Sequence, residues 1–228
     1  MHPILDPRTK ELIINMPELI KNFKYRKGPD LYFYRKTMEL RRKKPLDELF
    51  ESESDRYLEL IYATLVSWDM NSRRAKMKYF DKFKTSILKN KKSLLHLSPY
   101  KLDLLSDNEF REVKRVCEKI YSNMHVMESS GKLVSNSKTM HFIVPDLVMP
   151  MDRQNTLKFF FGNTGESKSR FLTVFERSHQ IAKDIDLEQF LDEEWNLSKP
   201  KVIDNAIISY MSPKYNIARA GLGADQII

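Results

Sequence analysis

The chain has 228 residues, with 39 lysines and arginines against 31 aspartates and glutamates, a net charge of +8 and a pI near 9.3. Hydrophobic residues at 41% and charged residues at 31% are typical of a globular protein with its own core. No run of about 18 apolar residues could span a bilayer, and the N-terminal segment lacks the basic start and apolar centre of a signal peptide. We therefore expect a cytoplasmic protein without a membrane partner.

Basic residues are gathered in a few stretches of the chain. They recur at 41–44, 73–84 and 89–92, whereas 184–194 is acidic. Because neutralising phosphates releases condensed counterions, a strongly basic side favours a polyanionic partner. Nucleic acid is the leading candidate, and the alternative is a set of lysine-rich helix faces that only meet water.

The first clear helical pattern starts at Ser54 and ends before the polar break from Trp68 to Ser72. Its apolar positions recur at helical spacing: Tyr57, Leu58, Ile61, Tyr62 and Leu65. A second helix is predicted over about 72–88, with an apolar face made of Met77, Phe80 and Phe83. The basic residues of this helix would then face outward, where they can meet phosphate.

Ser106 and Glu109 form a capping-box pattern, which predicts the start of a further helix. Cys117 lies on the apolar side of that helix, so we expect it in the core. As the single cysteine of the chain, it excludes an internal disulfide, a zinc finger and a cysteine-ligated iron–sulfur cluster.

Little in the sequence favours a sheet. The chain has six glycines and no sustained alternation of apolar and polar residues, and helical patterns resume from about Ser167, Asp186 and Pro200. We expect an all-α fold of two lobes that share a cleft. Residues 57–153 would form a central lobe, and residues 1–56 with 154–228 would form a lobe from the two chain ends.

The segment GKLVSNSKTMHFIVPDLVMPMDR, residues 131–153, carries the most chemical information. Lys138 is expected at the head of a short apolar helix, and a proline-bounded loop leads to Asp152. The interval leaves room for about two helical turns and a return loop, so both side chains can reach one cleft. Burial would lower the pKa of the lysine and make it a nucleophile. The alternatives are that the amine of Lys138 stays in solvent and that Asp152 only caps a helix over 153–161.

The order of elements from about Tyr57 to Phe161 resembles that of the helix-hairpin-helix DNA glycosylases. LIYATLVSWDMNSRRAKMKYFDKF is similar to the helix, DNA-penetrating loop and next helix of that family. GKLVSNSKTM is similar to its phosphate-holding hairpin and lysine-bearing helix, and MPMDR resembles the stretch that ends in its essential aspartate. The resemblance implies catalytic roles for Lys138 and Asp152. It implies DNA contacts for Asp69, Asn71, Arg73, Arg74, Gly131, Lys132, Ser135, Asn136, Ser137 and Arg153.

Ser135 and Asn136 stand where the family has two closely spaced glycines. Because asparagine adopts the left-handed conformation more readily than most residues, a phosphate-binding turn can still form there. Asp69 and Asn71 fall in the loop that would fill the gap left by an extruded base. The alternative interpretation makes Trp68 a core aromatic and Asn71 a helix cap.

The resemblance implies a base-excision DNA glycosylase, with or without a lyase step, that acts on a damaged base extruded from double-stranded DNA. We expect a monomer at the nucleoid that needs no cofactor. We expect no metal site either, since His141 has no second ligand at metal spacing. Two other classes stay open, namely a non-catalytic helical nucleic-acid-binding protein and a protein-interaction module whose charge is incidental.

Overall fold

The computed structural model describes residues 6–23, 27–72, 76–213 and 215. Over this part of the chain most residues are helical and no strand forms, so the predicted all-α class is confirmed. The α-helices are, in chain order, α1 (Pro7–Ile14), α2 (Met16–Asn22), α3 (Pro29–Lys43), α4 (Leu46–Glu51), α5 (Ser54–Ser67), α6 (Phe80–Leu88), α7 (Lys91–Leu97), α8 (Asp107–Asn123), α9 (Leu133–Ile143), α10 (Lys158–Phe161), α11 (Lys168–Asp184) and α12 (Lys199–Tyr210). A π-helical turn, Arg153–Leu157, precedes α10, and a 3-10 turn, Glu188–Phe190, precedes α12.

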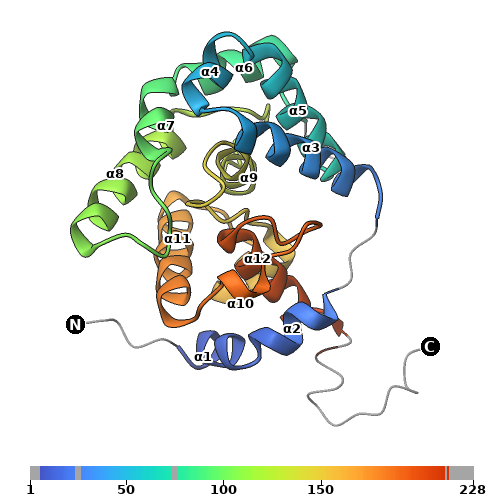
Figure 1. Cartoon of the computed structure of the whole chain (residues 1–228), viewed down its shortest axis with the longest axis vertical. Helices are drawn as coiled ribbons and strands as arrows, with labels where there is room; N and C mark the ends of the chain where they lie inside the picture. The colour runs from blue at the N-terminus through green and yellow to red at the C-terminus, as the bar shows by residue number, and fades with distance from the viewer. Residues whose placement is uncertain (1–5, 24–26, 73–75, 214, 216–228) are drawn as a thin grey trace.

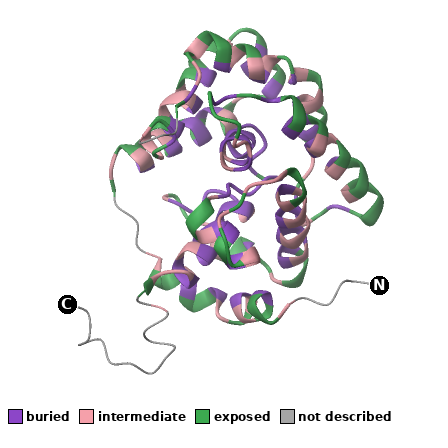
Figure 2. Ribbon diagram, turned by 180° about the vertical axis from the view of Figure 1, so that it is seen from behind, coloured by how far each residue is buried: buried purple, intermediate pink, exposed green. Residues whose placement is uncertain are grey.

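Helix α9 lies in the middle of the molecule (Figure 1). It packs against α3, α5 and α11, and Figure 2 shows most of its turns buried. Its C-terminal end is fixed by two hydrogen bonds. The Tyr57 hydroxyl donates to the Phe142 carbonyl at 2.7 Å, and Arg41 Nε donates to the Ile143 carbonyl at 2.8 Å. A helix packed on several sides holds its side chains at fixed positions.

The other helices surround α9 (Figure 1). Helices α3 and α4 pack on α5 on one side of it, and α2 packs on α12 on the other. Buried apolar side chains from both sides join in one core. Thus α3 and α4, which the predicted division placed in the lobe of the chain ends, pack with the central helices. The division at residues 56 and 153 itself stays a prediction.

Helix α5 has the predicted bounds and ends in a hydrogen-bonded turn. The Asp69 N–H donates to the Val66 carbonyl at 3.1 Å, and the Met70 N–H donates to the Leu65 carbonyl at 3.0 Å. This pattern satisfies the last carbonyls of a helix and places one residue in the left-handed region, usually a glycine. Here it is Asp69, with a φ of 60°, the one non-glycine residue of positive φ in the described part of the chain. Asp69 therefore carries backbone strain.

The predicted helix 72–88 begins too early, because α6 covers only its second half. The residues before α6 are extended and pair with the loop after α8. The Lys78 N–H donates to the Val126 carbonyl at 3.0 Å, and the Glu128 N–H donates to the Lys76 carbonyl at 2.9 Å. These bonds join segments that are far apart in the sequence.

Helix α8 starts with the predicted capping box. The Ser106 N–H donates to Glu109 Oε2 at 2.9 Å, and the Glu109 N–H donates to Ser106 Oγ at 3.4 Å. Cys117 is buried in this helix, as expected. None of the helices described here is both long and apolar enough to cross a bilayer.

Candidate active site

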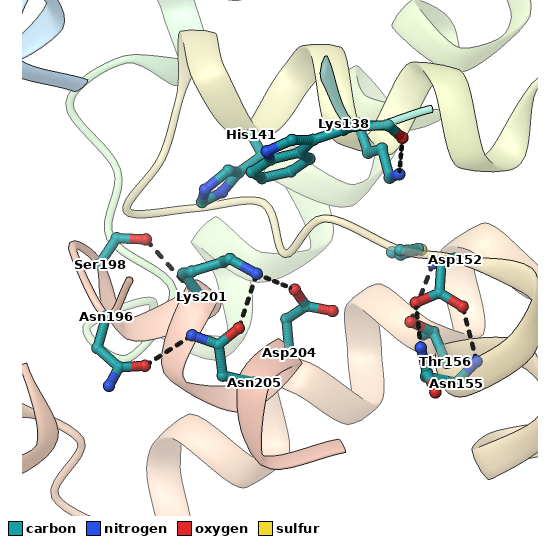
Figure 3. Close-up of polar contacts among 12 residues, drawn as sticks. Lys138, His141, Asp152, Asn155, Thr156, Asn196, Ser198, Lys201, Asp204 and Asn205 are labelled. Atoms are coloured by element: carbon teal, nitrogen blue, oxygen red, sulfur yellow. Dashed lines mark hydrogen bonds and ion pairs between the residues drawn. The ribbon is translucent and has the colours of Figure 1, made fainter. Parts of the chain in front are cut away.

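Lys138 and Asp152 line the same cavity, which has a volume of about 520 Å³. This volume lies within the range of about 300–1,000 Å³ that is usual for small-molecule pockets. In Figure 3, Lys138 comes from α9 on one side, and Lys201 and Asp204 come from α12 on the other. The full lining is Asp30, Ser67, Trp68, Asp69, Lys138, Pro150, Met151, Asp152, Asn155, Trp195, Lys201, Asp204 and Ile208.

Lys138 lies in the second turn of α9, because the helix starts at Leu133. The prediction that it stands at the helix start is therefore wrong. Its Nζ is 3.5 Å from the Trp68 carbonyl and 5.5 Å from the centre of the Trp68 ring. Burial lowers the pKa of Lys138, against the opposing charges of Asp152 and Asp204. At a given pH, a larger fraction of Lys138 is therefore in the neutral, nucleophilic form than for an ordinary lysine.

Asp152 is the N-cap of the π-helical turn, as the alternative interpretation predicted. Its two oxygens accept hydrogen bonds from the Asn155 backbone N–H at 2.6 Å and from Asn155 Nδ2 at 2.8 Å. Its own N–H donates to Thr156 Oγ1 at 3.0 Å. These contacts fix the direction of the carboxylate at the edge of the cavity (Figure 3).

The loop that carries Asp152 is tied to the helix that carries Lys138. The Met151 N–H donates to Ser137 Oγ at 3.1 Å, and the His141 ring pairs through Nδ1 with the Val148 carbonyl at 2.9 Å. Burial lowers the pKa of His141 to about 3, so its ring is neutral and Nδ1 is the donor. Ser137 is fully buried and anchors the loop. Its predicted contact with DNA is therefore wrong.

Sequence reasoning missed Lys201 and Asp204, a buried pair on the far side of the cavity. Lys201 Nζ lies 2.5 Å from Asp204 Oδ2 and 2.7 Å from Asn205 Oδ1, and both members of the pair are about 5% exposed. The Asn205 side chain donates in turn to Asn196 Oδ1 at 2.8 Å. A lysine and an aspartate three positions apart in the apolar run KVIDNAII were the available signal.

Lys201 is surrounded by groups that attract a cation. Its Nζ lies 5.2 Å from the ring centre of Trp68 and 5.7 Å from that of Trp195, which are cation–π distances. Burial raises the pKa of Asp204, and the charge of Lys201 opposes that shift. Of the two lysines in the cavity, Lys138 has the fewer partners and is the better nucleophile.

Asp69 is exposed at the edge of the cavity, next to Trp68. The rings of Tyr34 and Phe142 pack on Trp68, as expected for a core aromatic, although Trp68 also lines the cavity. Asn71 caps no helix, because its Oδ1 accepts the Met77 N–H at 3.1 Å within the loop. The predicted DNA contacts at Arg73 and Arg74 lie outside the described residues.

The predicted turn at Ser135 and Asn136 is wrong, because both residues lie in the first turn of α9 and are buried. Asn136 Nδ2 donates to the carbonyls of Tyr121 and Met124, each at 3.1 Å. These carbonyls belong to the end of α8, where the last carbonyls of a helix have no N–H donor within the helix itself. Asn136 therefore joins two helices, and the side chains of both residues are buried.

A carboxylate lies at the N-terminus of α9, where the resemblance places a phosphate. Glu166 Oε2 accepts the Leu133 N–H at 2.8 Å, and Glu166 Oε1 lies 2.5 Å from Arg153 Nε. A Cβ on Gly131 would lie 3.2 Å from both Arg153 Nη2 and Glu166 Oε2. Gly131 and Arg153 thus pack around Glu166, and Arg153 forms an ion pair with it.

Lys132 stays on the surface at the start of α9. Its Nζ donates to the Ser122 carbonyl and to His125 Nε2, each at 3.0 Å.

In comparisons with protein-family models, curated proteins and solved structures, nothing matches this chain. Among the described residues, no three histidine, cysteine or carboxylate side chains are grouped so that they could hold a metal ion.

Proposed function

We propose that the protein binds duplex DNA as a monomer at the nucleoid and excises a damaged base as a DNA glycosylase, distantly related to the helix-hairpin-helix enzymes. The observation that carries the proposal is the shared cavity of Lys138 and Asp152. A nucleobase needs a pocket at the small end of the usual range, and this cavity exceeds that size. The net charge of +8 supports a polyanionic partner.

The proposed reaction breaks the bond between the sugar C1′ and the base nitrogen. The electron pair of that bond leaves with the base, and positive charge develops on the sugar, where the Asp152 carboxylate stabilises it. The neutral amine of Lys138 then attacks C1′ and passes a proton to the departing base or to water. In the hydrolytic version of the reaction, water attacks in place of the amine.

Burial of Lys138 and capping of Asp152 suit these two roles. The lowered pKa supplies the neutral amine, and the Asn155 hydrogen bonds keep the carboxylate aimed at one place. Extrusion of a base costs a few kcal/mol, which side chains at the mouth of a cavity can offset. Asp69 and Trp68 line the cavity, and Asp69 is exposed.

The test is release of free base from duplexes that each carry one oxidised, deaminated or alkylated base, measured by mass spectrometry. The wild-type protein should release at least one of them, Lys138→Gln and Asp152→Asn should not, and Lys10→Gln on exposed α1 is the matched control. Trapping with borohydride then separates a lyase, which gives a covalent adduct, from a hydrolase. Duplex binding without any base release would favour the non-catalytic binding protein and exclude the glycosylase.

A further inference from the structure

A second group of cations lies away from the candidate active site, on the surface formed by α6 and the loop after α8. We call it the α6 patch, and it consists of Lys78, Lys82, Lys89, His125 and Lys132. The first four line a surface cavity of about 380 Å³, together with Asp81, Thr85, Ser86 and Asn123. Lys132 joins them through its contact with His125.

Hydrogen bonds between distant segments hold the patch together. The His125 N–H donates to Ser86 Oγ at 2.7 Å, which ties the loop to α6. The Lys78 N–H donates to the Val126 carbonyl at 3.0 Å, and Lys132 Nζ donates to His125 Nε2 at 3.0 Å. These bonds fix the loop after α8 against α6 and so place His125 and Lys132 beside the lysines of that surface.

The cations of the patch lack carboxylate partners. Neighbouring lysines outside the patch do have carboxylate partners, since Lys84 contacts Asp55 and Lys91 Nζ lies 2.9 Å from Glu51 Oε1. Over the described residues, Lys78, Lys82, Lys89 and Lys132 form no ion pair, and Asp81 is the one carboxylate that lines the cavity. Burial and the charges of Lys132 and Lys78 hold the pKa of His125 below its usual value. Convergent like charges of this kind favour a bound anion.

We infer that the α6 patch binds phosphates of the duplex DNA backbone, an inference that rests on the proposed DNA-binding function. Ammonium groups and an imidazole are donors suited to phosphate oxygens. Lys132 is the N-cap residue of α9, the helix that carries Lys138, so the patch adjoins the element that bears the candidate amine.

The patch also makes DNA binding depend on pH. The groups that face His125 are Lys132, Lys78, Lys82, Lys89 and the opposing carboxylate of Asp81. A phosphate among them favours the protonated ring and so raises the pKa of His125 on binding. By linkage, affinity for DNA increases as the pH falls through the interval between the bound and free pKa values.

The first experiment measures fluorescence anisotropy of an undamaged duplex at several salt concentrations. Lys78→Gln/Lys82→Gln/Lys89→Gln should lower the slope of log affinity against log salt by about 2.7, at about 0.9 for each lost phosphate contact. The control removes the same charge from exposed lysines of α1, α2 and α10, which lie at the other end of the molecule from α6 (Figure 1): Lys10→Gln/Lys21→Gln/Lys158→Gln. Equal slopes for the two triple variants would overturn the inference.

The second experiment needs no lysine variant. The ring signals of His125 are titrated by NMR in the free protein, with the duplex and with inorganic phosphate. The duplex should raise the pKa of His125 and leave the ring signals of His96, which contacts Glu112 at 2.9 Å, where they are in the free protein. The inference is contradicted if the duplex does not raise the pKa of His125, whether or not inorganic phosphate raises it. Since neither experiment requires base release, both outcomes are independent of the proposed catalysis.

Discussion

The buried pair of Lys201 and Asp204 allows a sharp prediction about stability. Lys201→Met leaves the Asp204 carboxylate buried without its partner at 2.5 Å. Breaking such a pair costs about 3–5 kcal/mol of the free energy of unfolding. In a chain of this length that corresponds to a fall in melting temperature of about 6–20 °C. Lys201→Met/Asp204→Leu removes both charges and should be close to wild type or more stable.

The cost of Lys201→Met should depend on pH. Burial already raises the pKa of Asp204 above 3.8, and loss of Lys201 removes a charge that opposes this shift. Between the unfolded and folded pKa values, the folded variant holds a proton that the unfolded chain has lost, so its stability falls as the pH rises. The deficit should therefore be smaller at about pH 5 than at about pH 7.5.

Urea unfolding of the wild type, both variants and Lys36→Met at the two pH values measures these differences. Lys36 pairs with Glu39 on the surface, where solvent screens the charges, so its removal should cost far less than that of Lys201. A cost for Lys201→Met as small as that of Lys36→Met, or a double variant as unstable as the single one, would refute the reasoning.

Three further predictions concern the cavity. Asp69→Gly should raise the free energy of unfolding by about 0.5–1 kcal/mol, because relief of a left-handed conformation outweighs the added entropy of the unfolded chain. It should nevertheless lower base release. Asp69→Asn removes the charge but keeps a residue that adopts the left-handed conformation, so in both assays it distinguishes the effect of the charge from that of the backbone strain. Ser137→Ala should speed hydrogen exchange of the Met151 amide and lower base release, and Ser122→Ala, exposed on α8, should do neither. Base release should rise with pH through the lowered pKa of Lys138 and level off below 10.5. A profile that still rises at that value contradicts a lowered pKa.

Local signals in the sequence predicted the helices that local chemistry controls. The end of α5 at Trp68 and the capping box of Ser106 and Glu109 follow from residues within one turn of each other. The shared cavity of Lys138 and Asp152 also agrees with the sequence, because a short helix and a proline-bounded loop limit where the chain can go.

Contacts between distant segments account for what the sequence did not predict. Met77 fits the apolar period of α6, yet its neighbours Lys76 and Lys78 pair with the loop after α8. Asn136 resembles a turn residue, but its amide satisfies carbonyls at the end of α8 and so lies inside a helix. Lys201 reaches the cavity only because α12 packs beside the loop of Asp152.

The measurement that tests the central claim most directly is an NMR titration of the Lys138 amine in the wild type and in Asp152→Asn. The pKa of Lys138 should lie below 10.5 in the wild type. Because the charge of Asp152 raises this pKa, Asp152→Asn should lower it further, whereas Asp81→Asn on exposed α6 should leave it unchanged. A wild-type pKa at the ordinary lysine value, or no change in Asp152→Asn, would contradict a cavity shared by the two groups.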